Sequence, residues 1–276
     1  MRPDTFPITD DHIHIDPKNG RGIEAAKDFM RSGGTHLFLV SKPSWSLGVD
    51  PSSGADYSSV FDETVRIGHL ISELGIVVYP VLGVHPAEIS RLEDRLGLES
   101  VVAVMKGGLD LAAHYVMDGN AYALKSGRPH YDVSPEIWSA SNDILTHALQ
   151  LAKECNCALQ IHAEAGPCHD VVEMARRAGI KLDRVVKHYA TPDTHLLPSF
   201  IATHEAIPKL CREKRRFTME SDYMDENSRP GAVIGPKSVP RFTKQLLAQG
   251  LISEEDCHRI HAETVEMVYG VPIILS

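Results

Sequence analysis

Residues 76–85, Ile-Val-Val-Tyr-Pro-Val-Leu-Gly-Val-His, form a short apolar run that ends in a histidine. Short apolar runs bounded by Gly or Pro are typical of strands buried on both faces of a parallel sheet. The run follows an amphipathic helical pattern over 60–74, which Gly75 ends. The segment therefore predicts a buried parallel strand with a histidine at its carboxyl end.

The same alternation of strand and helix continues in both directions along the chain. Further strands are predicted at the segment ending in His12-Ile-His14 and at 35–40, 121–127, 157–162, 184–188, 197–202 and 217–222, with helices at 136–154 and 171–178. Eight such repeats predict an α/β protein of the (β/α)8 TIM-barrel type, with a parallel sheet, as one domain over 1–276. An open doubly wound sheet is the alternative, but no Gly-rich phosphate loop follows the first strand.

Composition narrows the class of protein. The formal net charge of -9 gives no general surface for nucleic acid, so a small-molecule or phosphodiester substrate has to be held locally. No apolar run approaches the length of a membrane span, and no signal-peptide pattern precedes the first strand. The five cysteines are scattered without a framework spacing. These features predict a cytoplasmic protein that does not bind membranes, and they are compatible with a homo-oligomer.

Residues with metal-ligand chemistry stand at the ends of the predicted strands. His12 and His14 are two residues apart, so a strand directs both imidazoles to the same face and toward one metal ion. Four more side chains end later strands: Lys125, His162, His188 and Asp222. Because the carboxyl ends of barrel strands meet at one mouth, these positions predict a shared metal site.

The order of these motifs resembles the TatD-like metal-dependent hydrolases of the amidohydrolase superfamily. The resemblance rests on Asp-His-Ile-His-Ile-Asp (11–16), Gly-Val-His-Pro (83–86), Gln-Ile-His-Ala-Glu (160–164), Val-Lys-His-Tyr (186–189), Met-Glu-Ser-Asp (219–222) and Glu-Thr-Val-Glu-Met-Val-Tyr-Gly-Val (263–271). It implies a TIM-barrel enzyme with one or two divalent metals, Zn²⁺ first, with Mn²⁺, Fe²⁺, Ni²⁺ or Mg²⁺ as alternatives.

The resemblance also implies the role of each ligand. His12, His14 and Asp222 would hold one metal, and His162 and His188 would hold the second. Two metals lower the pKa of a bridging water, which Asp222 would orient and deprotonate. The resulting hydroxide would attack a phosphodiester bond, as in a nuclease.

The fourth strand departs from the family pattern. TatD-like proteins usually place a bridging glutamate where this chain has Lys125. At an effective dielectric near 20, an ammonium about 4 Å from a divalent ion costs several kcal/mol. In the phosphotriesterase-like branch of the superfamily, a lysine at this strand reacts with CO2, and the carbamate bridges two metals. Lys125 is therefore predicted to be carboxylated, and an unmodified lysine with one metal or none is the alternative.

Other residues near the strand ends are predicted to assist. His85 could contact substrate or, equally, serve a capping or turn role. Glu164 and Tyr189 could orient a ligand or donate a proton, and Glu220 could enter the barrel mouth. Arg128 and His130 follow strand four, where they could form a local anion patch or remain solvated in the loop.

Three functions remain open from the sequence. The first is a nuclease-like phosphodiesterase, and the family resemblance implies a deoxyribonuclease. The second is a hydrolase of a small ester, lactone, amide or phosphotriester, which Lys125 favours. The third is a metal-binding barrel without catalysis.

Overall fold

The computed structural model describes residues 6–228 and 233–275, and the chain divides into two compact units. Within the described residues, unit 1 comprises 6–39, 67–79 and most of 198–275. Unit 2 comprises 40–66 and 80–197. The division passes through two elements, α2 (Ser58–Ser72) and β3 (Val77–Gly83).

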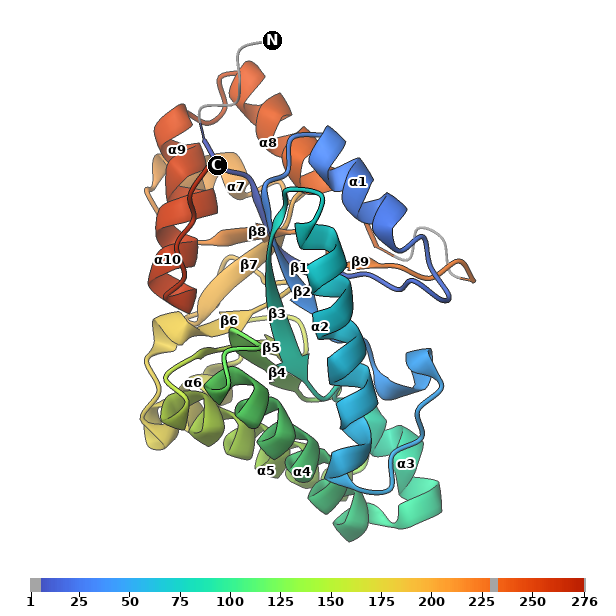
Figure 1. The fold of residues 1–276 in the computed structure, drawn as a ribbon. Helices are drawn as coiled ribbons and strands as arrows, with labels where there is room; N and C mark the ends of the chain where they lie inside the picture. Colours follow the sequence, from blue (N-terminus) through green and yellow to red (C-terminus); the bar gives the residue numbers. More distant parts are fainter. Residues whose placement is uncertain (1–5, 229–232, 276) are drawn as a thin grey trace. The chain divides into compact units, whose positions relative to one another are not determined.

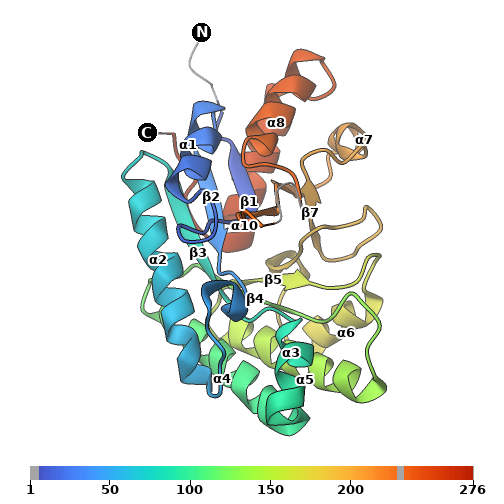
Figure 2. The same cartoon turned by 90° about the vertical axis from the view of Figure 1, so that its right-hand side faces the viewer.

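Unit 2 is built on parallel strands paired in chain order: β3, β4 (Ala123–Gly127), β5 (Ala158–His162) and β6 (Val185–Lys187). Two short 3-10 helices, η1 (Ser44–Leu47) and η2 (Gly54–Tyr57), precede these strands. The elements between the strands are α3 (Glu88–Leu96), α4 (Leu98–Met117), α5 (Pro135–Glu154), α6 (His169–Ala178) and η3 (Leu182–Arg184). The helices α4 and α5 lie side by side in both views (Figure 1, Figure 2). Because the strands are parallel, all their carboxyl ends lie at the same edge of this sheet.

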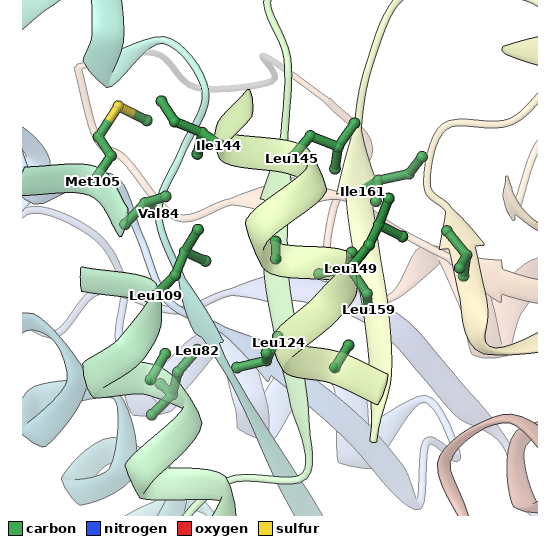
Figure 3. Packing of buried hydrophobic residues seen from close by; sticks show 14 of the residues in the cluster. Leu82, Val84, Met105, Leu109, Leu124, Ile144, Leu145, Leu149, Leu159 and Ile161 are labelled. Carbon is green, nitrogen blue, oxygen red and sulfur yellow. The ribbon is translucent and has the colours of Figure 1, made fainter. Parts of the chain in front are cut away.

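The core of unit 2 lies between its strands and α4 and α5. Figure 3 shows Leu145 and Leu149 of α5 directed toward Leu159 and Ile161 of β5. All four side chains are fully buried, and each such burial stabilises the fold by about 1.5–3 kcal/mol. This apolar packing fixes the strand ends that carry the predicted ligands.

Unit 1 is built around β1 (Thr9–His14), which pairs in parallel with β2 (His36–Val40) on one side and β9 (Tyr223–Met224) on the other. A second parallel pair joins β7 (Leu197–Ile201) to β8 (Thr218–Glu220). The remaining elements are α1 (Ile23–Arg31), α7 (Ile207–Arg212), α8 (Ser238–Ala248), α9 (Glu254–His258), the π-helical turn η4 (Arg259–Glu263) and α10 (Thr264–Tyr269). Buried side chains of β1, α1 and β2, including Ile13, Phe29 and Leu37, form an apolar cluster.

Parallel strands that alternate with helices confirm the predicted α/β fold of TIM-barrel type. The weakest predicted strand, 197–202, is present as β7. The short strand β9 was not predicted, because its two residues lie in a segment that reads as a loop. In the part of the chain that the structure describes, no helix has both the length and the apolar character needed to cross a bilayer.

Candidate metal site

Two histidines of β1 form the first half of the predicted site, in unit 1. His12 and His14 are fully buried, and their Nε2 atoms are 3.2 Å apart. Strand geometry places both side chains on one face, as the sequence pattern predicts. The pair therefore presents two imidazole nitrogens to the same point.

Asp222 joins this pair from the end of β8. Its backbone has φ of 45°, in the left-handed region, so the chain turns at this residue and continues as β9. The amide of Asp222 donates a hydrogen bond to the carbonyl of His12 at 2.9 Å. Its Oδ1 lies 3.8 Å from Nε2 of His12. The turn thus brings the carboxylate to the histidine pair.

These three side chains fit a divalent metal. Two ligands bound at 2.0–2.1 Å to a tetrahedral Zn²⁺ lie about 3.3 Å apart, which matches the spacing of the two Nε2 atoms. His12 and Asp222 belong to a group of side chains whose ligand atoms could hold a metal ion. Mixed imidazole and carboxylate donors suit Zn²⁺ and the other transition metals.

Two aspartates in unit 1 support these ligands, and the sequence patterns gave no reason to select them. Asp10 Oδ1 accepts hydrogen bonds from the amides of His12 at 3.2 Å and Ser221 at 3.0 Å, and burial raises the pKa of its carboxyl to about 7. Asp10 thus ties the backbone of the histidine pair to the residue before Asp222.

The second supporting aspartate is Asp225, which directly follows β9 and is fully buried. Its carboxylate accepts hydrogen bonds from the amides of Asp16 at 3.0 Å, Arg21 at 2.7 Å and Gly22 at 2.8 Å. The hydroxyl of Tyr223 donates a fourth at 2.8 Å. Asp225 therefore anchors the loop that follows His14 to the segment that follows Asp222.

Lys125 and His162 lie on adjacent strands of unit 2, where glycines allow close packing. His162 is the last residue of β5, whereas Lys125 is the third of the five residues of β4 and not, as the sequence predicted, its end. Lys125 is buried, with 3% of its surface exposed. A Cβ atom at Gly83 would lie 1.8 Å from the carbonyl oxygen of Lys125, and one at Gly127 would lie 1.8 Å from that of His162. The residues after these glycines, Val84 and Arg128, donate backbone hydrogen bonds to the same two carbonyls. The glycines thus let neighbouring strands hold the backbone of each predicted ligand.

Four imidazoles meet around His162. Its Nδ1 lies 2.7 Å from Nε2 of His188, and its Nε2 lies 2.6 Å from Nδ1 of His130. The ring of His85 is 5.0 Å from that of His162 between centroids. The predicted ligands His162 and His188 are therefore in contact, and His85 and His130 flank them.

Burial and nearby positive charge lower the pKa of two imidazoles of this cluster, His85 and His162. Burial is the largest cause that lowers the pKa of His85, to about 3, and the charge of Lys125 adds to it. Burial also lowers the pKa of His162 well below its usual value, with His85 and Lys125 adding to the effect. Neutral imidazole is the form that binds metals.

A second buried lysine lies beside the cluster and was not selected from the sequence. Lys187 is 2% exposed, and its Nζ donates hydrogen bonds to the carbonyls of Ala163 at 3.1 Å and His188 at 2.9 Å. It therefore links the carboxyl ends of β5 and β6. In the sequence, this buried position is indicated by a single lysine that directly follows two valines of a short apolar segment.

Arg128 corrects the expectation of an exposed loop cation. Its side chain is 1% exposed, and its guanidinium makes five hydrogen bonds, to Glu164, Asp170 and Asn142. The guanidinium also stacks on the ring of Trp138, 4.5 Å from the centroid. Because arginine has five N–H donors, Arg128 is already fully engaged inside unit 2 and cannot form an anion patch without giving up a bond.

The remaining predicted residues have separate surroundings. Glu164 is a partner of Arg128, and Tyr189 is 58% exposed. Glu220 is fully buried at the end of β8, where it pairs in register with Ile201 of β7. Their contributions to the site stay predictions.

Comparisons with known proteins agree with the motif order. The family model described as TatD related DNase matches residues 9–270. An uncharacterized protein of Methanocaldococcus jannaschii, MJ1127, is 33% identical, with 98% of each chain covered.

Solved structures show the same fold at low sequence identity. A phosphotriesterase homology protein from Escherichia coli, complexed with phosphate in its active site, superposes with a TM-score of 0.63 and 13% identity, covering 96% of this chain and 99% of that one. The TatD homolog YJJV from Escherichia coli superposes with a TM-score of 0.62 and 14% identity, covering 96% of this chain and 98% of that one. Organophosphorus hydrolase from Deinococcus radiodurans superposes with a TM-score of 0.61 and 12% identity, covering 96% of this chain and 93% of that one.

Proposed function

We propose that this chain, which belongs to the TatD-related DNase family and is a metal-dependent hydrolase, cleaves a small organic ester or phosphate ester at a binuclear site. The observation that carries the proposal is Lys125, which is buried within β4 at the position where the family pattern has a glutamate. In the proposed site, His12, His14 and Asp222 hold one metal, and His162 and His188 hold the other.

Lys125 would complete the site as a carbamate. The neutral Nζ would attack the carbon of CO2: a new N–C bond forms, one C=O electron pair moves to oxygen, and Nζ gives one proton to solvent water. A buried position favours the neutral amine over the ammonium. The product replaces a repelling cation with an anion that offers two oxygen ligands.

The bound metals would supply a water of lowered pKa and polarise the substrate oxygen. Side chains of the protein would orient the water, accept its proton and hold the ligands in position. Asp222 would orient the attacking water and accept its proton, which its position beside His12 supports. Asp10 and Asp225 hold the backbone on either side of the unit 1 ligands, while Lys187 does so in unit 2.

Phosphodiester cleavage in nucleic acid is the second candidate, and the family match favours it. The net charge of -9 and the internal engagement of Arg128 weigh against a polynucleotide. A small substrate needs no such electrostatic surface.

Metal content and mass test the proposal first. Elemental analysis of the purified protein should find two divalent metals per chain, and native mass spectrometry should find the added mass of one CO2, lost in Lys125→Arg. A metal-loaded protein with an unmodified lysine would contradict the carbamate. Protein that binds no divalent metal would contradict the whole site.

Substrate class is tested on metal-loaded protein with aryl and alkyl esters, a lactone, bis(4-nitrophenyl) phosphate and a single-stranded oligonucleotide. Asp222→Asn is the control for contaminating activity. The small substrates should be hydrolysed faster than the oligonucleotide, whereas the reverse order would favour the nuclease.

A further inference from the structure

Aromatic side chains gather at the carboxyl ends of the unit 2 strands. Three of them, Trp45, Tyr131 and Tyr189, are here called the aromatic rim. Trp45 is half-buried, Tyr131 is 41% exposed and Tyr189 is 58% exposed. Tyr131 follows β4, and Tyr189 directly follows the predicted ligand His188.

Two rim residues flank the imidazole cluster. The ring of Trp45 meets that of His85 edge-on, with centroids 5.8 Å apart. The ring of Tyr131 meets that of His130 edge-on at 5.6 Å. His85 and His130 in turn contact His162. A row of ring contacts therefore leads from Trp45 through His85, and from Tyr131 through His130, to this predicted ligand.

Neighbouring residues of α3 hold both rim residues in place. The hydroxyl of Tyr131 donates a hydrogen bond to Oγ of Ser90 at 3.1 Å. The guanidinium of Arg91 lies over the ring of Trp45, 5.4 Å from its centroid. Because Ser90 and Arg91 are adjacent in α3, this helix holds both η1, which carries Trp45, and the loop after β4, which carries Tyr131.

Tyr189 has an independent mark of function. Its φ is 51°, in the left-handed region that non-glycine residues rarely adopt. Such backbone strain is concentrated at functional sites. The turn presents a large apolar ring to solvent beside a predicted ligand.

We propose that the aromatic rim binds a flat ring of the substrate next to the bond that is cleaved, so that the substrate class is an ester with an aryl or other planar unsaturated group. The inference rests on the proposed function. Rings stack or meet edge-on with favourable energy beyond simple burial, and ligand sites are lined mainly by apolar and aromatic side chains. A polar or purely alkyl substituent would leave the exposed rings without this contact.

Tryptophan fluorescence tests the proposal without measuring activity. The chain has two tryptophans, so Trp138→Phe leaves Trp45 as the only one and keeps a ring against Arg128. Metal-loaded protein on this background is titrated with phenylphosphonate and with methylphosphonate. The phenyl compound should change the Trp45 emission and bind roughly tenfold more tightly. Equal affinities would overturn the proposal.

Variants of the rim supply the second test, by calorimetry in the wild-type background. Tyr131→Ala and Tyr189→Ala should weaken phenylphosphonate roughly three- to tenfold each and leave methylphosphonate within about twofold. The matched control is Tyr122→Ala, because Tyr122 is 39% exposed but precedes β4 and so lies at the other end of the strand. An equal effect of Tyr122→Ala would overturn the proposal.

The outcomes separate this inference from the proposed function. Hydrolysis without any preference for phenyl over methyl would refute the rim alone. If the protein binds the phenyl ring through Tyr131 but holds no metal and hydrolyses no substrate, the proposed function is refuted and the rim is not. Thymidine 5′-monophosphate, titrated in parallel, shows whether the ring accepted is a nucleobase or a simple aryl group.

Discussion

The carboxylate of Asp225 occupies the space that a side chain at residue 20 would need. A Cβ atom added at Gly20 would lie 2.3 Å from Cγ of Asp225 and 2.4 Å from its Oδ1. Asp225 is fully buried and held by three backbone amides, so it has little freedom to move away. The loop after His14 and the segment after Asp222 therefore pack together only with a glycine at this position.

Gly20→Ala should displace this carboxylate and weaken metal binding in unit 1. Groups that hold metal ligands in place typically contribute about 10- to 100-fold to affinity, and overpacking costs about 1–3 kcal/mol of stability. Calorimetric titration with Zn²⁺ and thermal unfolding measure the two effects. The control is Gly235→Ala, since no atom lies within 4 Å of a Cβ built at Gly235. Native affinity in Gly20→Ala would show that the contact does not position the ligands.

Asp222→Asn should remove catalysis while the fold is retained. The variant keeps the shape of the side chain but loses the charge that binds metal and the base that accepts a proton, so kcat should fall by about 10²–10⁴-fold. Steady-state rates and circular dichroism measure activity and fold. Asp56→Asn is the control, because Asp56 also accepts backbone hydrogen bonds, from Ser52 and Ser53, but belongs to η2, ahead of α2. Substantial activity left in Asp222→Asn would remove it from the mechanism.

Arg128→Met should destabilise the protein rather than weaken the binding of an anionic substrate. The change leaves Glu164 and Asp170 without their guanidinium, but both are partly exposed, so solvent reduces the cost to about 1–3 kcal/mol. Urea unfolding measures the loss, and Arg176→Met controls for an exposed pair on one helix. A large rise in KM at unchanged stability would instead assign Arg128 to substrate binding.

Stability should depend on pH through His261, which is fully buried between Thr9 and Thr243. Burial lowers its pKa from 6.5 to about 4, so below pH 6.5 the unfolded chain binds a proton that the folded chain does not. The free energy of unfolding should therefore fall as pH drops from 6.5 toward 4, by up to about 1.4 kcal/mol per pH unit from this group.

His261→Gln should remove that part of the pH dependence, measured by urea unfolding of metal-free protein between pH 7 and 5. Exposed His195→Gln controls for the loss of a histidine as such. An unchanged slope in His261→Gln would mean that other groups account for the acid sensitivity.

The fold was predictable because strand and helix periods are local properties of the sequence. The apolar run at 76–85 became β3, and even the weak candidate at 197–202 became β7. The family resemblance followed from motifs at or near the strand ends. The structure brings His12, His14 and Asp222 together in unit 1, and His162 and His188 together in unit 2, and their roles as ligands stay predictions.

The supporting residues were not predictable because their partners are distant in sequence. Asp225 bonds to amides some 200 residues earlier in the chain, and a backbone amide leaves no mark on residue type. Arg128 read as a loop residue because Glu164 and Asp170 reach it only after the strands have paired. Trp45 was not selected from the sequence, and only the structure places its ring against His85.

The engagement of Arg128 has a consequence for how the enzyme would select charge. A site with a free guanidinium attracts anions whether or not metal is bound, whereas here the guanidinium is already satisfied by the chain's own carboxylates. Attraction for a phosphate or carboxylate would then come from the metals and not from Arg128. Occupancy of the metal site would govern recognition as well as catalysis, and removal of the metals would weaken the binding of an anionic substrate even where its other contacts remain.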